Sequence, residues 1–286
     1  MKRIAILPTL LTLGNGVCGL VAITYAAKIS IPNDNPTLLA LNENYFAAAG
    51  WFILFGMVFD MLDGYVARLS KTASEFGGEL DSLCDVVTFG ITPAFLLLKL
   101  GPGSEPNPFF LYQLLFGIAA LYFCCAAIRL ARFNVDNTPD PSGHKRFKGL
   151  PSPGAAGCIA ALAILRGEFP KTLHERVPNI DPEAARETIT RIVVIASPLA
   201  ALIVALLMVS NVPFPHVTGK VFRGKKRIGR LVQVLLAGVI LVMFHSLAPL
   251  LIFWIYAVVF PLRAVLVRNL RPEPEPTPPA DEHVAK

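Results

Sequence analysis

The stretch 60-DMLDGYVAR-68, followed after eight residues by 77-GGELDSLCD-85, places acidic residues inside otherwise apolar sequence. Asp60 and Asp63 are three residues apart, and Asp81 and Asp85 are four apart, so each pair lies on one face of a helix. A short turn near 70–76 makes the two helices antiparallel neighbours. The sequence therefore predicts that four carboxylates converge at one end of a helix pair.

Four converging carboxylates point to bound cations. An acidic residue at membrane depth costs about 2.5–3.5 kcal/mol, and less near the interface. The simpler alternative is a helix-end charge solvated by lipid headgroups, which we favour for Glu75 and Glu79. Oxygen ligands select Mg²⁺, Mn²⁺ or Ca²⁺ over zinc. Two such ions about 3.5–4 Å apart form a clamp for diphosphate chemistry. We expect a metal site, with two ions, made by Asp60, Asp63, Asp81 and Asp85.

The residues between the acidic pairs fit a nucleotide diphosphate. Gly64 and Ala67 leave a shelf without bulky side chains, against which a base or diphosphate can pack. Arg68 follows directly and can pair with phosphate oxygens. Gly77 permits close approach of the backbone to a ligand. We expect these residues, together with Asp60, to bind the nucleotide.

The composition is that of a polytopic membrane protein. Of the 286 residues, 54% are hydrophobic and 16% are charged, and the mean hydropathy is +0.57. A soluble domain carries about 25% charged residues. These values exclude a soluble enzyme, a disordered chain and a disulfide-stapled module. The five cysteines fall in apolar runs and fit small buried hydrophobic residues. We expect membrane lipids, and no nucleic acid, as partners.

Eight segments are long enough, or nearly so, to cross a bilayer, which takes about 20 residues. They are about 4–27, 45–67, 80–99, 109–131, 150–166, 189–210, 229–246 and 249–267. Most of the 26 lysine and arginine residues fall on one side if the N-terminus is cytoplasmic. We therefore expect both termini and the acidic site at the cytoplasmic face of the cell (inner) membrane. The main exceptions lie in the outer loop 167–188.

The pattern D-x2-D-G-x2-A-R-x8-G-x3-D-x3-D resembles the signature of the CDP-alcohol phosphotransferases at every position. The resemblance implies an all-α bundle with a six-helix core, a cytoplasmic site and a homodimer. It implies that Asp60, Asp63 and Asp81 bind metal, and that Asp85 is both metal ligand and general base. It also assigns the cytidine nucleotide to Gly64 and Ala67, and the diphosphate to Arg68.

Softer cues favour one branch of that family. The segments 7-LPTLLTLGN-15, 91-ITPA-94, 129-RLARFN-134 and 149-GLPSP-153 are similar to bacterial and archaeal phosphatidylserine synthases. This likeness implies an enzyme that transfers the phosphatidyl group of CDP-diacylglycerol to L-serine. The same chemistry with inositol phosphate or glycerol 3-phosphate remains an alternative. Either phosphorylated acceptor would favour a denser arginine cluster.

Arg129, Arg132 and Asn134 are the candidates for binding the acceptor or a lipid phosphate. Arg129 lies in an otherwise apolar helix, where polar groups usually face a functional cavity. Anchoring to anionic lipid is the competing interpretation of both arginines. Asn15 is expected to form hydrogen bonds between helices, with a place in the site as the less favoured reading.

A divalent-cation transporter is the distant alternative for four aspartates. Transporters bind near the midplane and usually contain repeats, whereas these acids lie at one face of a chain without a visible repeat. For domains, we expect a catalytic core at 1–215, a basic loop and transmembrane hairpin at 216–270, and a Pro-rich disordered tail at 271–286.

Overall fold

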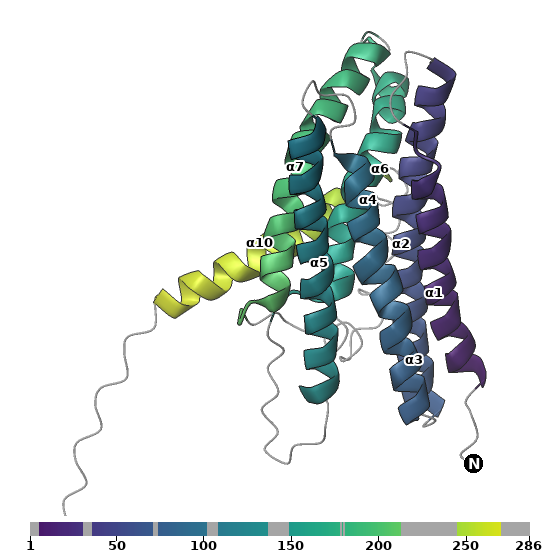
Figure 1. Cartoon of the computed structure of the whole chain (residues 1–286), viewed down its shortest axis with the longest axis vertical. Coiled ribbons are helices and arrows are strands. Elements are labelled where there is room, and N and C mark those ends of the chain that lie inside the picture. The colour runs from purple at the N-terminus through teal and green to yellow at the C-terminus, as the bar shows by residue number, and fades with distance from the viewer. Residues whose placement is uncertain are drawn as a thin grey trace, which may run out of the picture.

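The computed structural model describes residues 6–30, 36–70, 74–101, 108–136, 149–177, 179, 181–212 and 245–269. The described part is all helical, as the sequence predicts (Figure 1). Its helices are α1 (Ile6–Ala27), α2 (Pro36–Ser70), α3 (Glu75–Asp85), the π-helix η1 (Val86–Ile91), α4 (Thr92–Leu100), α5 (Pro108–Asp136), α6 (Ser152–Arg176), α7 (Pro182–Val209) and α10 (Ala248–Asn269).

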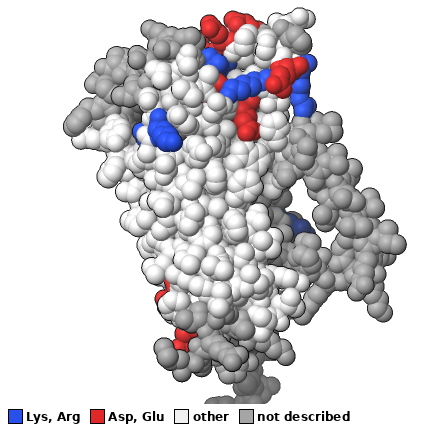
Figure 2. Space-filling view, turned by 90° about the vertical axis from the view of Figure 1, so that its right-hand side faces the viewer, with Lys and Arg blue, Asp and Glu red and all other residues white. Residues whose placement is uncertain are grey.

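Five helices of the described part are long and apolar enough to cross a membrane. They are Ile6–Ala27, Thr37–Ser70, Glu75–Leu100, Phe110–Val135 and Pro182–Val209. Figure 2 shows a broad uncharged face at mid-height, with most of the visible charged side chains gathered near one end of the molecule. Large apolar side chains on the outside, such as Leu20, Phe116 and Ile195, are well exposed. This is the surface of a protein whose solvent at mid-height is lipid.

The expected third span, 80–99, is a compound helix. It consists of α3, η1 and α4 in direct succession. Ser74 caps its start, because its hydroxyl accepts a hydrogen bond from the Gly77 backbone N–H at 3.1 Å. Similarly, the Asp181 side chain accepts from Glu183 N–H and caps α7, which begins before the expected span 189–210.

Helix α6 lies at the centre of the bundle rather than against lipid. It packs against α2, α7 and α10, and most of its first half is fully buried. It extends beyond the expected span 150–166 and carries charged residues in its second half. Protein rather than lipid therefore covers much of this helix. A helix in that position does not need an apolar surface along its whole length, which fits its absence from the five helices that are long and apolar enough to cross a membrane.

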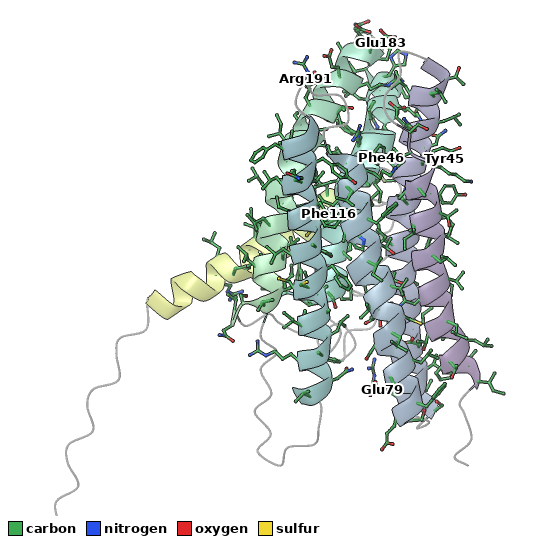
Figure 3. All side chains as sticks on the ribbon, in the orientation of Figure 1. Tyr45, Phe46, Glu79, Phe116, Glu183 and Arg191 are labelled. Atoms are coloured by element: carbon green, nitrogen blue, oxygen red, sulfur yellow. The ribbon has the colours of Figure 1, made fainter. Side chains whose placement is uncertain are left out.

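A buried ion-pair cluster joins α2, α6 and α7 at the end of the bundle that carries Glu183 and Arg191 (Figure 3). Glu43 of α2 is 6% exposed and pairs with Arg186 of α7 and with Lys171 of α6. Lys171 and Arg186 belong to the outer loop whose basic residues are exceptions to the expected orientation. The fold uses both of them to neutralise a buried carboxylate.

Helix α10 packs on α6 and then runs obliquely away from the bundle (Figure 1). The expected partner of its hairpin, 229–246, lies almost entirely outside the described residues. The basic loop from 216 and the tail 271–286 lie outside them as well. The hairpin and the three domain boundaries therefore remain predictions.

Candidate active site

Three of the four predicted acidic residues meet at the end of α2 and the start of α3. The carboxylate oxygens of Asp60, Asp63 and Asp81 lie within 4.8 Å of one another. Asp63 is buried, and the other two are half-buried. The three-residue spacing within α2 puts Asp60 and Asp63 on one face, and α3 brings Asp81 to the same place. The predicted convergence is confirmed for these three.

The cluster has the properties of a cation site. One oxygen of Asp63 and one of Asp81 are buried and accept no hydrogen bond from the described residues. Three acidic groups this close repel one another, and their unpaired oxygens lose hydration without compensation. A hard cation bound by oxygen ligands would satisfy both demands. The residues present therefore fit Mg²⁺ or Mn²⁺.

Asp85 lies one helical turn further along α3 and has a different environment. It is 8% exposed and is not part of the three-residue cluster. Its Oδ1 accepts a hydrogen bond from Asn15 Nδ2 of α1 at 2.9 Å. Asn15 is itself fully buried, so it orients the carboxylate from a fixed position. The hydrogen-bonding role expected for Asn15 is thus observed, and its partner is a site residue.

The π-helix η1 begins directly after Asp85 and fixes this junction. The Thr88 hydroxyl donates to the backbone oxygen of Asn15 at 2.9 Å. The Tyr122 hydroxyl, fully buried on α5, donates to the Phe89 backbone oxygen at 3.2 Å. Short π-helical segments inside α-helices frequently mark functional sites. Here the wider turn places Thr88 against α1, where its hydroxyl binds the backbone of Asn15. The side chain of the same asparagine binds Asp85.

Glycines allow α1 and α2 to come this close to η1. A Cβ atom on Gly56 would lie 2.6 Å from Thr88 Cγ2 and 2.9 Å from Asn15 Oδ1, and a Cβ on Gly19 would lie 2.6 Å from Thr88 Oγ1. Sequence reasoning missed Gly19, Gly56 and Thr88. Small residues on the faces of membrane helices were the available signal.

Replacing Gly56 with alanine should therefore destabilise the protein and lower its turnover together. The added methyl group overpacks the junction, at a cost of about 1–3 kcal/mol, and displaces Asn15 from Asp85. Thermal unfolding in detergent and activity measure the two effects. Gly117→Ala is the matched control, because a Cβ there meets nothing within 4 Å. Equal behaviour of the two variants would contradict this account.

The predicted nucleotide residues border the acidic cluster. A Cβ built on Gly64 would lie 3.4 Å from Arg68 Nη1, an ordinary contact distance. The protein's own packing therefore does not require glycine at this position, which leaves space for a ligand beside the guanidinium. Ala67 is half-buried and Arg68 is exposed. Gly77 lies at the cap of α3, where its N–H donates to Ser74.

Arg129 is the predicted acceptor residue that lies nearest the acidic groups. It interacts electrostatically with Asp60 and Asp85, and its Nη1 donates to the buried Ser152 hydroxyl at 2.8 Å. Arg132 and Asn134 are exposed further along α5. Asn134 donates to Ser82 of α3 at 2.8 Å, and Arg132 reaches Asn211 at 3.5 Å. The structure thus brings Arg129 to the site and leaves the other two at its rim.

Comparison with known proteins identifies the family. The family model described as CDP-alcohol phosphatidyltransferase matches residues 5–212. The chain belongs to this family. The match contains every site residue described above and ends before α10 begins. The resemblance carried by the aspartate motif is therefore confirmed across the whole bundle of α1 to α7.

Three curated relatives, from an archaeon, a bacterium and a yeast, share one name. The chain is 33% identical over 201 residues to a CDP-diacylglycerol–serine O-phosphatidyltransferase of Methanocaldococcus jannaschii, covering 70% of this chain and 78% of the relative. It is 35% identical over 161 residues to the Bacillus subtilis protein of the same name, covering 55% and 75%. The Saccharomyces cerevisiae protein of that name is 34% identical over 160 residues, covering 54% and 51%. This CDP-alcohol phosphatidyltransferase thus spans about half of the yeast relative.

Proposed function

We propose that this CDP-alcohol phosphatidyltransferase transfers the phosphatidyl group of CDP-diacylglycerol to L-serine. The products are phosphatidylserine and CMP. The main support for this proposal is the arrangement of the acidic residues. Three clustered carboxylates, two of which have a buried oxygen without a hydrogen-bond partner among the described residues, lie beside Asp85, which Asn15 orients. The relatives named for this activity come from an archaeon, a bacterium and a yeast, which supports serine as the acceptor.

The residues divide the work as follows. Asp60, Asp63 and Asp81, with Asp85 at the edge, would hold one or two Mg²⁺ or Mn²⁺ ions. Bound cations of this kind neutralise a diphosphate and the CMP that leaves. Gly64, Ala67, Arg68 and Gly77 would seat the nucleotide against the cluster.

The reaction forms one bond and breaks one. The serine hydroxyl oxygen attacks the phosphorus that carries diacylglycerol, and the bond from that phosphorus to the bridging oxygen breaks. CMP leaves with the electron pair of that bond. Asp85 accepts the hydroxyl proton, because a neutral hydroxyl is a weak nucleophile without a base. Its hydrogen bond from Asn15 holds one carboxylate oxygen and leaves the other for the proton.

The direct test is CMP release from CDP-diacylglycerol by the purified protein. L-serine, glycerol 3-phosphate and inositol phosphate are compared as acceptors at equal concentration. We expect release with serine and little with the two phosphorylated acceptors. Preference for either of those would keep the chemistry and change the acceptor. No release with any of the three would overturn the proposal.

Arg129 and Arg132 provide a test of acceptor binding. If they bind the serine carboxylate, Arg129→Ala or Arg132→Ala should raise the KM for serine far more than that for CDP-diacylglycerol. Losing a charge-assisted hydrogen bond weakens affinity by about 10- to 150-fold. Lysine should restore only part of this, because an ammonium cannot form the bidentate fork of a guanidinium.

Kinetic measurements in which one substrate is varied while the other is saturating distinguish the possible roles of the two arginines. Equal weakening of both substrates would assign the arginines to the lipid phosphate. An unchanged serine KM with lower stability would mean that they only anchor the helix. Arg191→Ala is a control, since Arg191 pairs with Glu187 on the exposed surface of α7 at the other end of the bundle (Figure 3).

The membrane arrangement is also a proposal. The N-terminal end of α1 and the start of α3 lie at the same end of the bundle (Figure 1). We place this end, and both termini, on the cytoplasmic side of the cell membrane, where water-soluble serine and the nucleotide are accessible. A homodimer, with lipids as the surrounding partners, completes the proposal.

A further inference from the structure

The segment 149-GLPSP-153 forms a corner that the end of α7 holds in place. Gly149 has a φ of 87°, in the left-handed region that favours glycine, and a Cβ on it would collide with the backbone at the end of α7. The Gly149 N–H donates to the backbone oxygen of Val212, just past α7, at 2.9 Å. The Leu150 N–H donates to the backbone oxygen of Leu207 at the same distance. The chain is therefore fixed immediately before α6 begins.

Ser152 is the first residue of α6 and reaches from this corner to α5. Its side chain is fully buried, and its hydroxyl oxygen accepts a hydrogen bond from Arg129 Nη1 at 2.8 Å. The residue before it, Pro151, has a restricted φ, and its backbone oxygen accepts the hydrogen bond of Ala155 N–H at 3.0 Å. With the backbone held on both sides, the serine hydroxyl has a fixed position against the guanidinium.

Two further hydrogen bonds place Arg129 alongside Asp85. The Tyr122 hydroxyl of α5 donates to a backbone oxygen of η1 at 3.2 Å, and Asn134 near the end of α5 donates to Ser82 of α3 at 2.8 Å. These contacts run in opposite chain directions, so α5 is antiparallel to the compound helix of α3 and η1. Arg129 lies between the two contacts on α5, and Asp85 lies between them on the compound helix.

The guanidinium of Arg129 has one side held by protein and one side suited to a ligand. Its Nε atom is buried and donates no hydrogen bond to the described residues. A buried donor without a partner is unfavourable, so a bound group is expected there. The Nε side of a guanidinium matches a carboxylate, which can accept two parallel hydrogen bonds. Ser152 binds Nη1 and so orients the Nε side toward a ligand.

We propose that Ser152 is a positioning residue, which holds the Arg129 guanidinium in the orientation that receives the carboxylate of the acceptor. This inference rests on the proposed function, in which Arg129 binds that carboxylate. It gives a role to the segment 149–153, which the acidic cluster does not use. Ser152 acts through Arg129 and does not itself touch the reacting atoms.

The test is a double-mutant cycle on the full-length protein in detergent, combining Ser152→Ala with Arg129→Ala. Ser152→Ala should raise the serine KM about 3- to 10-fold and leave the KM for CDP-diacylglycerol within about twofold. In the Arg129→Ala background it should raise the serine KM no further, because coupled residues are not additive. Ser152→Thr, which keeps the hydroxyl, should recover part of the loss.

Ser197→Ala is the matched control. Ser197 is an equally buried serine of α7, and its hydroxyl donates to the Val194 backbone oxygen of its own helix, so its loss should leave the serine KM unchanged. If Ser152→Ala raised the KM of both substrates equally, or acted fully in the Arg129→Ala background, Ser152 would be only a packing residue and the inference would fail. The same KM increase in Ser197→Ala would also overturn it.

The wild-type protein separates this inference from the proposed function. If it releases CMP with serine and the cycle is additive, the inference alone fails. If it uses another acceptor and not serine, the proposed acceptor is wrong, and the same cycle run with the acceptor that is used decides the inference. Thermal unfolding midpoints of the four proteins in the cycle need no acceptor. Additive shifts in those midpoints would show that Ser152 and Arg129 do not interact, and would overturn the inference whatever the acceptor.

Discussion

Replacing Asp85 with asparagine should nearly abolish CMP release while leaving CDP-diacylglycerol bound. The amide oxygen of the new side chain can still accept the hydrogen bond that Asn15 donates at 2.9 Å, so the junction with η1 keeps its packing. What is lost is the ability to accept a proton. Removal of a general base lowers turnover by about 10²–10⁴-fold.

The measurement pairs turnover with binding of CDP-diacylglycerol to the same variant. Glu79→Gln is the matched control, since it removes a carboxylate from the same helix at an exposed position that points away from the bundle (Figure 3). Near wild-type turnover of Asp85→Asn would exclude the base role. A variant that no longer bound the nucleotide would instead assign Asp85 mainly to the metal site.

The part of the site that is local in sequence could be predicted. The spacing of Asp60, Asp63 and Asp81 fixes their faces, and one turn between two helices fixes their meeting. The start of α7 is likewise set locally, by the cap residue Asp181 and the proline after it. These features depend on a few neighbouring residues, whose geometry is nearly independent of the rest of the fold.

The supporting residues depend on packing between distant segments and could not be predicted. Asn15 and Asp85 are 70 residues apart, and nothing in the local pattern of α1 identifies the partner. The π-helical register of η1 is stabilised by Thr88 and Tyr122 through contacts with α1 and α5. Hydropathy likewise could not show that protein, rather than lipid, surrounds most of the first half of α6.

Metal binding should reverse the stability order of wild-type protein and an Asp81→Asn variant. In EDTA, wild type holds three carboxylates within 4.8 Å of one another, and two of their buried oxygens have no hydrogen-bond partner among the described residues. Neutralising one of them relieves repulsion, so the variant should melt at the same temperature or higher. With Mg²⁺ or Mn²⁺ at about 100 times its dissociation constant, wild type gains about 2.7 kcal/mol and should melt above the variant.

The same cluster couples the metal to the nucleotide. Asp60→Ala and Asp63→Ala should lose metal and nucleotide affinity together, because the diphosphate has no neutralising partner without the cations. The loss of metal affinity should exceed the roughly 10- to 100-fold that removing an outer-shell partner costs.

Chelation should abolish turnover of wild type, and Mg²⁺ or Mn²⁺ should restore it. Asp181→Asn, which keeps the cap of α7 far from the cluster, should respond to metal as wild type does. Full turnover in excess EDTA, from protein that carries no metal, would contradict a cation site here, because catalysis would then proceed without cations at the three carboxylates.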